Sequence, residues 1–121
     1  MIWIRTIPQT EATGRLETLY QRVKGADVSI DNILTAHSLR PQSLEGHLAL
    51  YKSVLHHRGN SLQKWFLECL GLYVSLMNKC EYCIEHHYEG LRRLLADDTR
   101  AAEIRNALED GNPARVFDGK E

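Results

Sequence analysis

The sequence predicts an all-α protein with five to six helices. Apolar residues recur at steps of three and four through most of the 121 residues, and no alternating run is long enough for a convincing strand. This length is typical of one domain, so we expect a single domain over 1–121. The 15 basic and 16 acidic residues leave a net charge of −1, which argues against binding to nucleic acid or to an anionic membrane surface.

An extended arm and three helices are predicted for the N-terminal half. Residues 2–8 are expected to lie on this subunit or a neighbour, or simply to form a tethered terminus. A first helix over 9–24 has apolar positions at helical spacing, and Gly25 is placed to end it. A helix of two or three turns is expected over 30–39. A third helix begins at Pro41, and its apolar stripe comprises Leu44, Leu48, Tyr51 and Leu55.

Three further helices are predicted after a polar break at 56–61, in which Asn60 or Ser61 is expected to cap the next helix. Residues 62–78 are apolar nearly all round, so they predict the central buried helix. The following helix begins near Cys80 and ends near Ala96, antiparallel to the central one. After a break at Asp97-Asp98-Thr99, a last helix over 101–108 ends at Gly111-Asn112-Pro113.

Two cysteines and a histidine form a compact cluster on the helix that begins near Cys80. Cys80, Cys83 and His87 are three and four residues apart, which places them on one helical face. The helix start favours a thiolate at Cys80, whereas His87 is placed to exchange a proton with Cys83. A thiolate that attacks a peroxide becomes a sulfenic acid, and a second thiol within reach converts it to a disulfide. The cluster therefore predicts redox chemistry.

Glu68 is the one charged residue of the central apolar helix that the pattern brings near this cluster. With a rise of about 1.5 Å per residue, Glu68 lies roughly 15 Å and His87 roughly 12 Å from the turn. The two side chains are expected to meet, because a buried carboxylate needs a partner and a histidine would be one. The alternative is that Glu68 faces solvent.

The pattern Asn78-x-Cys80-x-Tyr82-Cys83-x-x-x-His87, preceded by Glu68, resembles the active-site motif of the AhpD-like alkylhydroperoxidases. These belong to the carboxymuconolactone decarboxylase superfamily, and the stretches 32–41 and 74–78 are similar to its peroxidase-related subgroup. The resemblance implies an all-helical homo-oligomer, commonly a trimer or hexamer. It further implies that Cys83 attacks the peroxide, Cys80 resolves the product, and His87 with Glu68 relays protons.

The substrate that follows is a hydroperoxide, and the electrons must come from an external thiol or dithiol, since nothing resembles a nucleotide or flavin site. We expect neither an organic cofactor nor a metal. No secretory signal or membrane span is legible, so a cytoplasmic location is expected. Tyr82 stands where the best-known members carry a histidine. Many members continue into further C-terminal helices, so we expect neighbouring subunits to complete the core.

Several other interpretations of the cysteine pair remain open on the residues alone. Cys80 and Cys83 are also compatible with core thiols, with a redox sensor, or with a structural helical oligomer that lacks peroxidase activity. A zinc site would need a fourth ligand beside His87, and the adjacent His86 points about 100° away on a helix. Cys69 is expected to be an inert core thiol. Lactone decarboxylation rests on superfamily analogy alone and is disfavoured.

Overall fold

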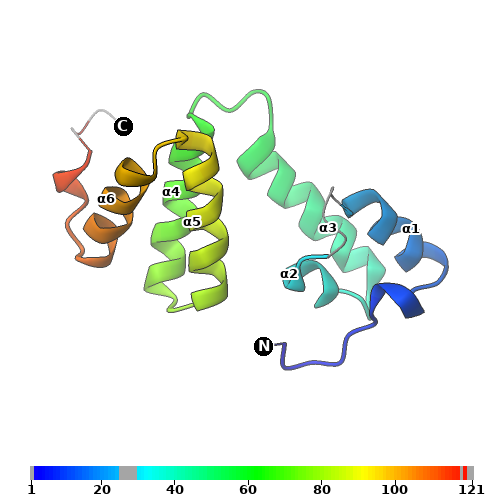
Figure 1. Ribbon diagram of the computed structural model, residues 1–121. Helices are drawn as coiled ribbons and strands as arrows, with labels where there is room; N and C mark the ends of the chain where they lie inside the picture. The colour runs from blue at the N-terminus through cyan, green and yellow to red at the C-terminus, as the bar shows by residue number, and fades with distance from the viewer. Residues whose placement is uncertain (1, 25–29, 118, 120–121) are drawn as a thin grey trace. The chain divides into compact units, whose positions relative to one another are not determined.

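The computed structural model describes residues 2–24, 30–117 and 119. The chain divides into two compact units, Met1–Val54 and Leu55–Glu121 (Figure 1). Within the described ranges every regular element is helical, which confirms the all-α prediction. The six α-helices are α1 (Gly14–Val23), α2 (Asn32–Thr35), α3 (Pro41–Tyr51), α4 (Lys64–Met77), α5 (Glu81–Leu95) and α6 (Asp98–Glu109). The single domain over 1–121 stays a prediction.

The first unit is built from α1, α2 and α3 around a small apolar core. Its buried members are Leu16, Leu19, Tyr20, Leu34 and Leu44. The N-terminal arm is fixed to this unit at Ile7, whose N–H donates to Ser38 Oγ at 2.8 Å and whose carbonyl accepts from the Tyr20 hydroxyl at 2.9 Å. The arm therefore lies on its own subunit at this point, although Trp3 is 93% exposed.

Several predicted helix bounds in this unit are wrong. The helix expected over 9–24 is a 3₁₀ turn, Gln9–Glu11, followed by α1, because Ala12 and Thr13 have extended backbone with ψ angles of 135° and 158°. The helix over 30–39 shortens to α2, since the N–H groups of His37, Ser38 and Arg40 bond to carbonyls three residues back. Leu55 falls in a π-helical segment, Lys52–His56, that follows α3. Gly25 lies outside the described residues.

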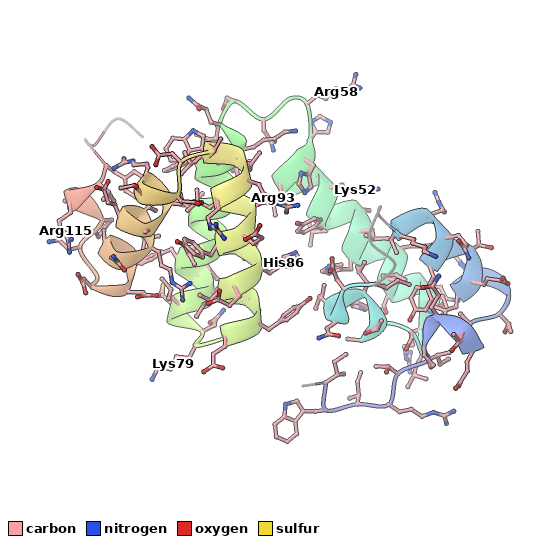
Figure 2. All side chains as sticks on the ribbon, in the orientation of Figure 1. Lys52, Arg58, Lys79, His86, Arg93 and Arg115 are labelled. Carbon is pink, nitrogen blue, oxygen red and sulfur yellow. A yellow bond between two sulfur atoms is a disulfide. The ribbon has the colours of Figure 1, made fainter. Side chains whose placement is uncertain are left out.

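The second unit is a three-helix assembly whose core lies between α4, α5 and α6. Helices α4 and α5 form the predicted antiparallel pair, and Lys79 lies at the turn that joins them (Figure 2). The buried core residues are Cys69, Leu72, Leu91, Ala101, Ile104 and Leu108. Cys69 is thus a core thiol, as predicted.

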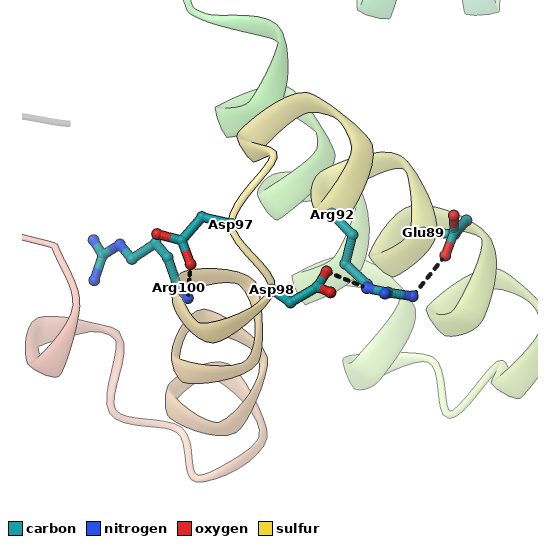
Figure 3. A network of polar contacts seen from close by, with 5 residues as sticks. All are labelled: Glu89, Arg92, Asp97, Asp98 and Arg100. Atoms are coloured by element: carbon teal, nitrogen blue, oxygen red, sulfur yellow. Dashed lines mark hydrogen bonds and ion pairs between the residues drawn. The ribbon is translucent and has the colours of Figure 1, made fainter.

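Capping contacts explain where α6 begins. Asp97 Oδ1 accepts the Arg100 N–H at 2.9 Å, so α6 begins at Asp98 rather than at the predicted residue 101 (Figure 3). Arg92 joins the end of α5 to this cap through Asp98, at 2.9 Å, and also contacts Glu89 at 3.1 Å (Figure 3). Helix α4 begins after Gln63, whose side chain makes no capping bond, so the predicted cap at Asn60 or Ser61 is wrong.

No helix in the described part of the chain is long and apolar enough to cross a membrane.

Candidate active site

The turn between α4 and α5 fixes the position of the first cysteine. Lys79 adopts a left-handed conformation with φ 53°, its N–H donates to Leu76 O at 3.1 Å, and the Cys80 N–H donates to Ser75 O at 3.1 Å. This pair of bonds is a Schellman motif, in which the last carbonyls of a helix are satisfied by the reversing chain. The motif ends α4 and places Cys80 at the start of α5.

Cys80 is the N-cap residue of α5 and is bonded to Cys83. The Cys80 Sγ accepts the Cys83 N–H at 3.4 Å, and the two sulfurs form a disulfide with a Cα–Cα distance of 5.3 Å. Both residues are half-buried. In the reduced protein, a thiolate at this N-cap position is stabilised by a backbone N–H donor and by the positive end of the helix dipole.

Glu68 and His87 meet between the two helices, as the sequence predicts. His87 Nδ1 lies 2.8 Å from Glu68 Oε2, and the two side chains are only 19% and 11% exposed. The alternative in which Glu68 faces solvent is therefore wrong. Because an ionised carboxylate can only accept, Nδ1 carries the proton in this bond. In a neutral ring with this tautomer, Nε2 is the proton acceptor.

His87 lies one helical turn after Cys83 on α5, which places their Cβ atoms about 5–6 Å apart. The structure therefore brings together Glu68 with His87 and Cys80 with Cys83, on one helical hairpin. The catalytic roles expected for these four residues stay predictions.

Two glycines against the buried pair were missed by the sequence reasoning. A Cβ at Gly71 would lie 2.5 Å from Nδ1 and Cε1 of His87, and one at Gly90 would lie 2.8 Å from Cδ of Glu68. A glycine inside a helix pattern costs helix stability relative to alanine, and that cost was the sequence signal at both positions. They also follow Glu68 and His87 at the same spacing of three residues.

Ser75 is a third missed residue, and it connects Gly71 to the turn that precedes Cys80. Its buried hydroxyl donates to Gly71 O at 2.7 Å, while its own carbonyl accepts the Cys80 N–H at 3.1 Å. A small polar residue in the last turn of an apolar helix was the available sequence signal. Ser75 thus holds the end of α4 in the geometry that positions both Gly71 and Cys80.

Other residues near the motif lie outside this arrangement. His86 is exposed and stacks on Tyr82 with ring centroids 5.9 Å apart, and Tyr82 itself is 40% exposed. Cys69 lies in the core between the helices of the second unit. Among residues 2–24, 30–117 and 119, no group of three or more His, Cys, Asp or Glu side chains is arranged to hold a metal ion.

Comparisons with family models, with curated proteins and with solved structures gave no match to this chain. Membership of the AhpD-like family therefore stays a prediction that rests on the motif.

Proposed function

We propose that this protein is a cysteine-based peroxidase that reduces hydroperoxides through a Cys80/Cys83 dithiol–disulfide cycle. One observation carries the proposal. The buried Glu68–His87 pair lies on the same hairpin as the cysteine pair, so a thiol couple and a carboxylate-oriented imidazole occur within one element. A carboxylate that fixes the tautomer of a histidine beside a nucleophile is a recurrent arrangement for moving a proton.

In the first step, His87 Nε2 takes the proton of the Cys83 thiol, and the thiolate attacks one oxygen of the hydroperoxide. A sulfur–oxygen bond forms as the oxygen–oxygen bond breaks, which leaves a sulfenic acid on Cys83. The departing alkoxide takes the proton from the imidazolium and leaves as an alcohol, or as water when the substrate is hydrogen peroxide. Glu68 stabilises the transient positive charge on His87.

In the second step, the Cys80 thiolate attacks the sulfur of the Cys83 sulfenic acid. The sulfur–sulfur bond forms, the sulfur–oxygen bond breaks, and the hydroxide takes a proton and leaves as water. The N-cap position of Cys80 supports this step because it favours the thiolate without a neighbouring base. Two electrons and two protons from an external thiol or dithiol then restore both cysteines.

An AhpD-like fold and a homo-oligomeric state, a trimer or hexamer, belong to the same proposal. Both rest on the resemblance of the Glu68 to His87 motif. The hairpin geometry agrees with that resemblance because it pairs the residues that the motif assigns to the proton relay.

The proposal is tested by titrating thiols in the reduced protein before and after one equivalent of peroxide. We expect wild type to lose two thiols per chain and Cys83→Ser to lose peroxide-dependent oxidation. Cys80→Ser should stop at a sulfenic acid on Cys83, which a sulfenic-acid reagent would label. A label on Cys80 in the Cys83→Ser protein would reverse the two roles. Unchanged thiols in wild type would contradict the proposal and favour a redox-sensing or structural role.

A further inference from the structure

The buried pair and the two glycines are arranged symmetrically about the hairpin turn. Glu68 and Gly90 each lie eleven residues from Lys79, and Gly71 and His87 each lie eight residues from it. Each side chain of the pair therefore faces the glycine of the opposite helix. Because α4 and α5 run antiparallel, equal distances from the turn correspond to equal depths in the hairpin.

The space beside each glycine, where a Cβ would lie, is occupied by a side chain of the Glu68–His87 pair. At Gly71 an added Cβ would meet Cε1 and Nδ1 of His87 at 2.5 Å and Cγ at 2.9 Å. At Gly90 it would meet Cδ, Oε2 and Oε1 of Glu68 at 2.8, 3.0 and 3.1 Å. All of these nearest atoms belong to side chains, and none belongs to the backbone of the opposite helix. The glycines therefore make room for the pair rather than for a close approach of two backbones.

An alanine at Gly71 would act on the geometry of the histidine. The Nδ1 edge of the ring lies over Gly71, and the same Nδ1 makes the 2.8 Å contact to Glu68. A ring that this clash displaces from α4 has a longer contact to Glu68, because Glu68 also lies on α4. Once the contact is lost, the carboxylate no longer selects the tautomer, and Nε2 is no longer fixed as the acceptor.

We propose that Gly71 and Gly90 are positioning residues that hold His87 in the Nδ1–H tautomer against Glu68. The effect of these glycines on catalysis rests on the proposed function, whereas their effect on the His87 tautomer does not. Both glycines lie inside helices, where alanine is the better helix former, so packing against the pair is what opposes an alanine there.

The experiment compares Gly71→Ala and Gly90→Ala with Gly46→Ala, a matched control. Gly46 also lies inside a helix, α3, and an added Cβ there meets nothing within 4 Å. Nitrogen-15 NMR of His87 reports the tautomer directly. We expect the Nδ1–H form to dominate in wild type and in Gly46→Ala, and to give way to a mixture in Gly71→Ala and Gly90→Ala. A wild-type tautomer in Gly71→Ala would overturn the proposal.

A second readout is the midpoint of thermal unfolding, on which Gly71→Ala should have opposite effects with and without the His87 ring. Gly71→Ala should lower the midpoint of thermal unfolding in wild type but raise it in a His87→Ala background, where the clash is gone. If Gly71→Ala fails to fold, folding of the double variant supports the proposal. Failure of both variants to fold, although His87→Ala alone folds, would overturn it.

A third readout is enzyme kinetics. If the wild-type protein has peroxidase activity, Gly71→Ala should reduce kcat/KM about a hundredfold. If wild type shows no such activity, the proposed function fails, and the NMR and unfolding results still decide the positioning role.

Discussion

Removal of the His87 ring should destabilise the second unit because it leaves a buried carboxylate without a partner. Glu68 is 9% exposed as a residue, and His87 is its hydrogen-bond partner among the described residues. A hydrogen bond to a charged group contributes about 1.5–3 kcal/mol, and breaking a fully buried ion pair costs about 3–5 kcal/mol. Since both side chains retain some exposure, we expect His87→Ala to cost about 2–3 kcal/mol. The thermal midpoint would fall by roughly 10–20 °C.

The neighbouring histidine provides the control for this prediction. His86 is exposed on the same helix, so His86→Ala should change the free energy of unfolding by less than about 0.5 kcal/mol. The measurement is unfolding by heat and by urea, followed by circular dichroism. A double-mutant cycle of Glu68→Ala and His87→Ala isolates the coupling between the two side chains. The reasoning is refuted if His87→Ala costs no more than His86→Ala, or if the cycle shows no coupling.

Two further predictions concern the turn and the first unit. Lys79→Gly should stabilise the protein by about 1 kcal/mol in urea unfolding, because the left-handed conformation at φ 53° is costly for lysine and free for glycine; a loss of stability would contradict this account of the turn. Burial, together with the nearby His37, holds the pKa of His47 below its ordinary value of 6.5, so the unfolded chain binds this proton more readily than the folded one. The free energy of unfolding should therefore fall as the pH drops from about 7 through 6.5 and below. If the free energy of unfolding of His47→Phe falls with pH as steeply as that of the wild type, another group is responsible.

The pairing of Glu68 with His87 could be predicted because it depends on a few regular quantities. Helix type followed from apolar spacing, and the turn was marked by polar residues at 78–79. A constant rise per residue then gave comparable depths for the two side chains. The 2.8 Å contact confirms that estimate. Prediction succeeded here because an antiparallel hairpin leaves little freedom once its turn is located.

The remaining details depend on tertiary contacts that spacing does not encode. Gly71 and Gly90 matter because side chains from the other helix fill the space beside them, and this requires the rotation of each helix about its axis. The bounds of α2 depend on turns beside Ser38, whose hydroxyl bonds to the distant Ile7. The end of α3 depends on a change to π-helical bonding after Tyr51. Local propensity is too weak to predict such outcomes.

Two features of the sequence favour ionisation of two different cysteines: the helix start favours a thiolate at Cys80, and His87 favours deprotonation of Cys83. Cys80 Sγ is the N-cap acceptor of α5, so the backbone favours its thiolate whether or not a base is near. Cys83 is one turn before His87, and in the proposed cycle the imidazole that Glu68 contacts removes the proton of Cys83. A resolving thiol must be ionised when the sulfenic acid forms, and an attacking thiol must return its proton to the leaving oxygen. The two sources of activation therefore fit two successive steps of the proposed peroxidase cycle rather than compete for one.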